Sequence, residues 1–292
     1  RGIFMKDVIV IVGPTGVGKT KLSIELAKKL DGEIINADSV SIYKGLDIGS
    51  AKPTKSEQME VPHHLIDIRE VSEEYSIFDY QKDARREIDE IQKRGKTVIM
   101  VGGTGLYIKS ALYDYNFTEN TTYNEYSNLT NEEILKKIHS INSNLDIHVN
   151  NRKRLVRMLN KLENNEIITS NKDKLLYNVK IIGLTTDREI LYQRINKRVD
   201  NMIADGLLDE VAALKDKYDT SRILNNAIGY KEFKNYNGYN LEEVVDEIKK
   251  NSRHYAKRQY TFFNHQMNVT WFDVDFNNFT NTISEVEKFI KK

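Results

Sequence analysis

A short apolar run followed at once by a glycine-rich loop constrains this chain more than any other feature. Val8–Val12 reads as a buried strand, Gly13–Thr20 reads G-P-T-G-V-G-K-T, and the helix-forming run Lys21–Leu30 follows. The loop matches the pattern G-x-x-x-x-G-K-[ST] in its required context of strand before and helix after. Backbone N–H groups in such a loop point at phosphate oxygens, and the helix N-terminus adds a favourable dipole. The sequence therefore predicts an α/β fold that binds a phosphorylated ligand.

The residue types within this P-loop each suit that chemistry. Gly16 and Gly18 let the backbone turn, Lys19 supplies a positive charge, and the Thr20 hydroxyl can ligate magnesium. Magnesium is the one cofactor that we expect. The predicted diphosphate- or nucleotide-binding residues of the loop are Gly13, Pro14, Thr15, Gly16, Val17, Gly18, Lys19 and Thr20.

The order of apolar and amphipathic segments predicts how the rest of the chain is organised. Short apolar runs separated by helix-length segments are typical of βαβ units on a parallel sheet. Predicted strands are Val8–Val12, Ile34–Ala37, Val98–Val101, Val179–Leu184 and Val269–Val274; predicted helices include Lys19–Leu30, Tyr75–Arg94, Asp187–Tyr218, Leu241–Gln259 and Ile283–Ile290. We predict a P-loop NTPase-like parallel sheet flanked by helices, formed by residues 6–112 and 177–292. A small, polar, Asn-rich helical insertion at residues 113–176 interrupts it.

Composition excludes several other classes. The chain has 292 residues, of which 39% are hydrophobic and 30% charged, enough apolar material for a sizeable core. Its apolar runs are too short to span a membrane, and zero cysteines exclude disulfides, thiolate zinc sites and cysteine nucleophiles. The formal charge is +1, so a nucleic-acid partner must be met by local basic patches. With no secretory leader pattern, we expect a cytoplasmic monomer.

The predicted strand Val98–Val101 is followed by glycines and not by the carboxylate that a hydrolase would need there. P-loop hydrolases hold magnesium or polarise water with a carboxylate at the end of a second apolar strand. Val98–Val101 is followed by Gly102-Gly-Thr-Gly105, and the possible substitute Asp67 comes only after His63 and His64. Two adjacent histidines point in different directions without a third ligand at metal spacing, so we do not expect them to bind metal. The chain thus has phosphate-binding residues without a clear hydrolytic residue.

Two polar side chains follow predicted strands and would face the same crevice as the P-loop. Asp38 stands at the carboxyl end of Ile34–Ala37, where ligands bind in open α/β sheets, and Thr104 stands in the glycine turn after Val98–Val101. The Asp38 carboxylate could accept a proton from an incoming amine or hydroxyl, or it could cap a helix beginning near Val40. Thr104 could orient a substrate or cap the helix after its turn. The sequence leaves these alternatives open.

Three predicted helical stretches carry cations at helical spacing. They are Lys153, Arg157 and Lys161; Arg194 and Arg198; and Arg253 and Lys257 with the adjacent Arg258. Such faces are most often solvated. In a nearly neutral chain, contacts with a phosphate backbone or clamping of a pyrophosphate group are the competing interpretations. The sequence does not assign which face does which.

The motifs also follow one another in an order that resembles a known family. They are Gly13–Thr20, Asn36–Tyr43 (N-A-D-S-V-S-I-Y), Leu46–Pro53 (L-D-I-G-S-A-K-P), His63–Asp67, Val101–Tyr107 (V-G-G-T-G-L-Y), Ile228–Glu232 and Tyr255–Gln259. Their combination resembles the bacterial tRNA dimethylallyltransferases, also called tRNA isopentenylpyrophosphate transferases, over nearly the whole chain. D-S-x-x-x-Y together with G-G-T-G-L-Y is far more specific than a P-loop alone. The chain departs from the family pattern at Val149, at Asn164–Ile167 and at Tyr260–Asn264.

The resemblance implies transfer of a dimethylallyl group from dimethylallyl diphosphate to the exocyclic N6 amine of adenosine 37 in tRNA, with release of pyrophosphate. The diphosphate would bind the P-loop with magnesium, Asp38 would act as general base, and Thr104 would position the adenine or the transferring group. No water need be activated, which agrees with the missing carboxylate. The implied tRNA-binding residues are Asp38, Ser39, Val40, Ser41, Thr104, Lys153, Arg154, Leu155, Val156 and Arg157; Arg222 is a pyrophosphate candidate. The target base must leave its stack, so the insertion and basic helices would hold a splayed anticodon stem-loop.

Two other functions could use the same loop. A small-molecule kinase or ATPase predicts a carboxylate where Gly102 stands. A prenyltransferase acting on free adenine nucleotide would not need the insertion or three basic faces, and tRNA affinity with steep salt dependence would distinguish it. A purely RNA-binding module is disfavoured because it would have no use for Lys19 and Thr20.

Overall fold

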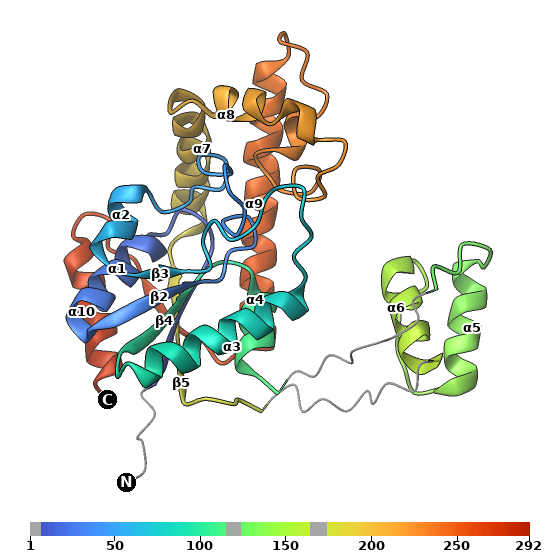
Figure 1. Ribbon diagram of the computed structural model, residues 1–292, viewed down its shortest axis with the longest axis horizontal. Coiled ribbons are helices and arrows are strands. Elements are labelled where there is room, and N and C mark those ends of the chain that lie inside the picture. The colour runs from blue at the N-terminus through green and yellow to red at the C-terminus, as the bar shows by residue number, and fades with distance from the viewer. Residues whose placement is uncertain (1–6, 115–123, 164–173) are drawn as a thin grey trace. The chain divides into compact units, whose positions relative to one another are not determined.

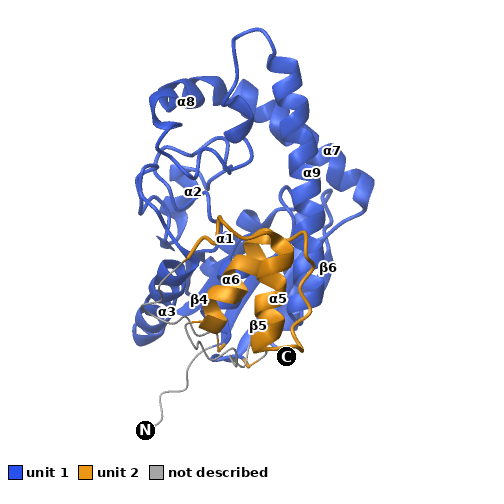
Figure 2. Cartoon of the chain, turned by 90° about the vertical axis from the view of Figure 1, so that its right-hand side faces the viewer, with its two compact units in different colours: residues 1–113, 175–292 blue, residues 114–174 orange. Residues whose placement is uncertain are grey.

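The computed structural model describes residues 7–114, 124–163 and 174–292, and divides the chain into two compact units (Figure 2). The larger unit comprises residues 1–113 and 175–292, and the smaller one comprises residues 114–174. The insertion predicted at residues 113–176 lies within two residues of these limits. At the base of the smaller unit, the N–H of Asp114 donates to the carbonyl of Lys174 over 2.8 Å. The entering and leaving chains are thus tied together.

A six-stranded parallel sheet, in the order β3-β2-β4-β1-β5-β6, forms the larger unit (Figure 1). The strands are β1 (Val8–Val12), β2 (Gly32–Asn36), β3 (His63–His64), β4 (Thr97–Val101), β5 (Val179–Thr185) and β6 (Thr270–Asp273). Val8 pairs in register with Val98 on one side and Val179 on the other, so β1 is central and the P-loop leaves the middle of the sheet. The predicted fold class is confirmed.

Helices cover both faces of this sheet. The helices described in this unit are α1 (Lys19–Leu30), α2 (Lys55–Glu60), α3 (Ile77–Lys93), α4 (Gly105–Leu112), α7 (Arg188–Ala204), α8 (Leu207–Ala213), α9 (Leu241–Gln266) and α10 (Phe279–Ile290), and not all of them touch the sheet. Val8 and Val10 share an apolar cluster with α3 and α4, whereas Ile9 and Ile11 share another with α1 and α10. Because successive side chains of a strand point to opposite faces, β1 must be apolar at every position. Full burial of each such side chain stabilises the fold by about 1.5–3 kcal/mol.

The predicted helical stretch Asp187–Tyr218 is divided in the structure. It contains α7, α8 and a 3₁₀ turn at Lys215–Lys217. Gly206 stands between α7 and α8 with φ of 103°, a left-handed conformation that favours glycine and ends the first helix. Helix α9 in turn continues seven residues beyond its predicted end at Gln259. None of the helices in the described ranges is both long and apolar enough to cross a membrane.

The smaller unit is a pair of helices, α5 (Asn131–Ile141) and α6 (Arg152–Glu163), with their own apolar core. The buried residues of this core are Ile134, Ile138, Ile147, Leu155, Val156 and Leu159. Thr130 begins α5 with a reciprocal capping box to Glu133. The Arg152 guanidinium donates to the carbonyls of Leu129 and Tyr126 over 2.9 and 2.7 Å, and so ties the start of α6 to the segment before α5.

Candidate active site

A cavity of about 790 Å³ lies at the carboxyl edge of the sheet in the larger unit. It is lined by residues of the P-loop, by Asp38–Ser41 after β2, and by one face each of α7 and α9. Pockets of roughly 300–1,000 Å³ are usual for small-molecule ligands. The cavity therefore lies where ligands bind in open α/β sheets.

The P-loop adopts the curled conformation that its glycines predict. Gly13, Gly16 and Gly18 have φ values of 137°, 85° and 100°, which residues other than glycine rarely adopt. Thr15, Gly16, Gly18, Lys19 and Thr20 line the cavity. The other three predicted loop residues support the loop from behind: Gly13 and Pro14 are buried beside β1, and Val17 packs fully buried in the core.

Cations from the loop and from α7 meet beside the P-loop. The Lys19 Nζ donates to the Pro14 carbonyl over 2.7 Å. Burial, followed by the charge of Arg198, lowers the pKa of Lys19 to about 7, and the charge of Asp38 partly opposes both. Burial likewise lowers the pKa of Arg198. Since a buried charge is costly without a partner, this group of cations is suited to an anionic ligand.

Arg194 is positioned directly over the P-loop. Its Nε donates to the Gly16 carbonyl over 2.9 Å, and its guanidinium lies 3.8 Å from the centroid of the Phe276 ring. Both contacts fix the guanidinium beside the loop, because a cation is attracted to the face of an aromatic ring. The sequence predicts that Arg194 and Arg198 share one basic face, but it does not say whether that face contacts RNA phosphates or a pyrophosphate group. The structure places that face on the cavity.

Arg222, the pyrophosphate candidate of the sequence analysis, lies elsewhere. Its side chain is 80% exposed and pairs loosely with Glu74 at 3.8 Å. Ile223 and Asn226 line the cavity, but Arg222 is not among the described residues that do so. Arg222 is therefore replaced by Arg194 and Arg198 as the pyrophosphate candidates.

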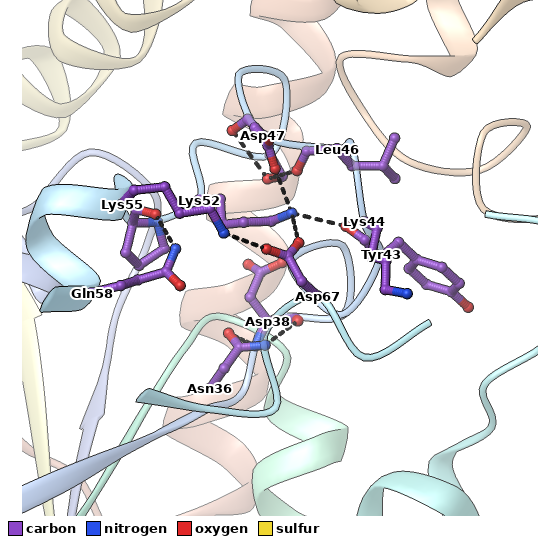
Figure 3. Close-up of polar contacts among 12 residues, drawn as sticks. Asn36, Asp38, Tyr43, Lys44, Leu46, Asp47, Lys52, Lys55, Gln58 and Asp67 are labelled. Atoms are coloured by element: carbon purple, nitrogen blue, oxygen red, sulfur yellow. Dashed lines mark hydrogen bonds and ion pairs between the residues drawn. The ribbon is translucent and has the colours of Figure 1, made fainter. Parts of the chain in front are cut away.

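Asp38 is held in the cavity wall by local hydrogen bonds (Figure 3). The Asn36 amide donates to the carbonyls of Asp38 and Leu65 over 3.0 and 2.9 Å, and its Oδ1 accepts from the Asp38 N–H. One Asp38 carboxylate oxygen accepts from the Val40 N–H over 3.0 Å. Turns, not a helix, follow Asp38, so the helix-cap alternative does not apply. Its carboxylate closes a tight turn and faces the phosphate site.

Thr104 acts on the same turn from the neighbouring strand. It stands at the N-cap position, just before α4, but makes no side-chain cap hydrogen bond. Its Oγ1 accepts from the Ser39 N–H over 3.1 Å and donates to the Ser39 hydroxyl over 3.3 Å. A side chain on Gly102 would overlap the backbone of Ala37, so the two turns are in direct contact. Thr104 thus holds the residue after Asp38, but unlike Asp38 it is not among the described residues that line the cavity, where the sequence predicted both.

Two cavity residues on α9 were not assigned a role from the sequence. The Tyr255 hydroxyl and the Gln259 amide both donate to the Gly103 carbonyl, over 3.3 and 3.1 Å. Burial, followed by the charge of Asp38, raises the pKa of Tyr255 to about 12. Their spacing of four residues on a helix was the available signal, because it places both side chains on one face.

The five residues of α6 predicted to bind tRNA divide into exposed and buried side chains. Lys153, Arg154 and Arg157 are exposed, whereas Leu155 and Val156 are buried in the core of the smaller unit. The side chains of Leu155 and Val156 therefore pack the helix pair and do not offer a surface to RNA. After β2, Ser39, Val40 and Ser41 all line the cavity of the larger unit.

The histidines and the substitute carboxylate have other partners. His64 lies between Glu33 and Glu87, at 2.6 and 3.0 Å. Asp67 accepts from Lys52 and Lys55 and does not line the cavity (Figure 3). In the described ranges, no group of three His, Cys, Asp or Glu side chains is arranged to hold a metal ion.

A parallel P-loop sheet with cations and a carboxylate on one cavity defines an α/β enzyme that acts on a phosphorylated substrate. A family model described as IPP transferase matches residues 41–266. The chain is 49% identical to the tRNA dimethylallyltransferase of Bacillus velezensis, over 92% of this chain and 91% of that protein. It is 45% identical to that of Anoxybacillus flavithermus, over 98% and 96%. The chain therefore belongs to the IPP transferase family and is a transferase.

Solved structures agree with this assignment. The tRNA isopentenylpyrophosphate transferase of Bacillus halodurans superposes with a TM-score of 0.76 at 41% identity, covering 98% of this chain and 95% of that one. A eukaryotic dimethylallyltransferase described as acting on tRNA gives 0.82 at 28% identity, covering 98% and 80%.

Proposed function

We propose that this chain transfers the dimethylallyl group of dimethylallyl diphosphate to N6 of adenosine 37 in the anticodon stem-loop of tRNA. The observation that supports it best is the placement of Asp38 on the same cavity as Lys19 and Arg198. A carboxylate beside a diphosphate site is suited to accept a proton from an attacking amine. The names of the relatives give tRNA as the acceptor to test and dimethylallyl as the group to transfer. The family resemblance gives N6 of adenosine 37 as the amine.

The leaving group is bound by the cations. The P-loop amides with Lys19, Arg194 and Arg198 hold the diphosphate and stabilise the charge that develops on it as the carbon–oxygen bond breaks. The bond from N6 to the allylic carbon forms in the same exchange, and the N6 proton passes to Asp38. Pyrophosphate then leaves with the electron pair of the broken bond. No water takes part, so the chain needs no hydrolytic carboxylate after β4.

The dimethylallyl group requires apolar walls, which one part of the cavity lining supplies. We call this the apolar end; its lining side chains are Ala51, Val199, Met202, Ile223, Ala227 and Ile228. All six belong to, or pack against, the apolar cluster that also contains α3 and α4. Burial of each methylene of the ligand there favours binding by about 0.8 kcal/mol.

Magnesium fits the donor set beside the P-loop. Magnesium is usually held by one or two protein oxygens together with substrate phosphates and water. The Thr20 hydroxyl lines the cavity and is the protein ligand that we propose for it. Bound there, the ion would neutralise part of the diphosphate charge.

A transfer assay with radiolabelled dimethylallyl diphosphate and magnesium tests the proposal. Unmodified tRNA, AMP and buffer are the three acceptors, and we expect label in tRNA alone, located to adenosine 37 by digestion. Label in AMP would assign the chain to nucleotide prenylation. No label in any acceptor, with ATP consumed in a parallel assay, would refute the proposed reaction.

A further inference from the structure

One carboxylate in the larger unit accepts hydrogen bonds from three consecutive backbone amides. Oε2 of Glu210, on α8, accepts from the N–H groups of Asp47 and Ile48 over 3.1 and 2.8 Å. Oε1 accepts from the Gly49 N–H over 3.1 Å and from the Tyr230 hydroxyl over 2.6 Å. An ionised carboxylate makes stronger hydrogen bonds than a neutral acceptor does. Glu210 therefore attaches the loop at residues 47–49 to α8.

Tyr230 completes the attachment by packing on the same loop. A Cβ atom on Gly49 would lie 2.6 Å from the Tyr230 ring, and one on Gly229 would lie 3.0 Å from the Gly49 carbonyl oxygen. Glycine at both positions lets the two backbones approach closely. Tyr230 itself is fully buried. The Glu210–Tyr230 pair thus joins the loop at residue 49 to the segment at residues 228–230.

These two joined segments form one continuous part of the cavity wall. Gly49, Ser50 and Ala51 line the cavity from one segment, and Ile228 and Gly229 line it from the other. Along α7, the wall residue Met202 lies eight residues beyond Arg194, which is about 12 Å at 1.5 Å per residue. The hydrogen bonds of Glu210 go to residues 47–49 and to Tyr230, and none of these belongs to the P-loop.

The loop has a second, independent attachment (Figure 3). Lys52 has a side chain only 2% exposed, and its Nζ donates to the Tyr43 carbonyl over 2.8 Å. It also donates to the carboxylates of Asp47 and Asp67. Because Lys52 holds the loop from within, loss of Glu210 should shift the wall without unfolding the loop.

We infer that Glu210, acting with Tyr230, is a positioning residue that fixes the place of this wall of the apolar end and thereby the affinity for the dimethylallyl group. The inference rests on the proposed function. Dispersion contacts weaken steeply when a gap of even half an ångström opens between a ligand and its wall. A displaced wall therefore costs contacts to the five-carbon group, while the P-loop still holds the diphosphate.

Calorimetric titration of Glu210→Gln with magnesium and no tRNA tests this, using dimethylallyl diphosphate and pyrophosphate as ligands. Glutamine offers one acceptor oxygen and turns N–H donors toward backbone N–H groups. We expect dimethylallyl diphosphate to bind about tenfold more weakly, comparable to unburying about two of its carbons. Pyrophosphate affinity should stay within about twofold, because the P-loop is untouched. Asp209→Asn, which alters the exposed neighbour on α8, is the matched control and should change neither constant.

Tyr230→Phe removes only the hydroxyl and should give a smaller shift in the same direction, which keeps the test open if Glu210→Gln does not fold. Equal weakening of both ligands would mean general disruption and overturn the inference. A lowered melting temperature with both affinities unchanged would also overturn it, since the pair would then be structural only. Failure of the proposed function appears differently: the wild-type chain itself would bind dimethylallyl diphosphate no better than pyrophosphate.

Discussion

Two glycine-rich turns leave the neighbouring strands β1 and β4, and glycine serves a different need in each. In the P-loop after β1 the need is conformational. Gly16 and Gly18 have φ values of 85° and 100°. A Cβ on Gly16 would meet no atom outside the loop closer than 3.9 Å, whereas one on Gly18 would also lie 2.8 Å from the Phe279 ring, so space adds to the conformational need there. The positive φ values curl the backbone so that its amides surround one point.

In the turn after β4 the need is for space. A Cβ on Gly102 would overlap the backbone of Ala37, and one on Gly103 would overlap the Gln259 amide. Neither of these two glycines has a positive φ. The β4 turn therefore serves to bring the end of β2 and helix α9 together. The comparison indicates that the P-loop curls its own backbone around the proposed diphosphate site, while the β4 turn positions the residues around Asp38. Substitutions in one turn should therefore affect diphosphate binding and substitutions in the other should affect the chemical step.

Removing the carboxylate that the β4 turn positions should have the largest effect. Asp38→Ala should slow the chemical step by about two to four orders of magnitude, because no general base remains for the N6 proton. Pyrophosphate affinity should stay nearly unchanged, since Asp38 does not donate to the ligand. Single-turnover transfer and calorimetry measure the two quantities. Unaltered turnover would remove Asp38 from the mechanism and leave it as the residue that closes a turn.

Adding a methyl group in the β4 turn should also slow the chemical step, although less than Asp38→Ala does, because it changes no reacting group. Gly103→Ala should lower turnover by roughly a hundredfold, because displacements near one ångström at a reacting centre have effects of this size. Pyrophosphate affinity should persist. Gly95→Ala is the control: Gly95 has φ of 72° with open space around it, so strain of about 1–2 kcal/mol lowers the melting temperature and spares turnover. If both variants keep full turnover, the positional role of the β4 turn is wrong.

Sequence alone could predict what is local. Helix α1 was predicted at Lys19–Leu30, the bounds that the structure has, because strand, loop and helix adjoin in the chain. Strand β3 was missed, since His63–His64 is too short to form a pattern and depends on pairing with β2. The break at Gly206 was missed because helical periodicity continues across it. Hydrophobic patterns show which segments are buried but not where a neighbouring helix must end.

The sequence could not show which of the cations lie beside the P-loop. Helical spacing groups Arg194 with Arg198, but it does not say which helix faces the P-loop. Arg194 reaches the Gly16 carbonyl across 178 positions of chain, and Arg222 was chosen in its place because of a neighbouring motif. Gln259 likewise meets Gly103 across 156 positions. These contacts depend on tertiary packing, and single-sequence periodicity carries no information about it.

Changing the charge of the P-loop without changing its shape should have an intermediate effect. Because the pKa of Lys19 is lowered to about 7, the free chain loses this charge as pH rises through 7. A bound anion raises that pKa, so binding takes up a proton and affinity falls with rising pH. We expect pyrophosphate with magnesium to bind about tenfold more weakly at pH 8 than at pH 6.5. Lys19→Arg keeps its charge and should flatten the profile; an equally steep profile in that variant would assign the dependence to another group.

The smallest effect should come from a cation in neither turn. Arg154 is exposed on α6 of the smaller unit. If it meets a tRNA phosphate, Arg154→Ala should flatten the slope of log affinity against log salt by about one unit and weaken tRNA binding about fivefold at 0.15 M salt. Pyrophosphate affinity and the chemical step should be unchanged, since both depend on the larger unit. Lys93→Ala, an exposed cation on α3, is the matched control and should leave the slope as it is. A slope unchanged by Arg154→Ala would return this face of α6 to a solvated surface, and the remaining basic faces, on α7 and α9, would then have to provide the phosphate contacts.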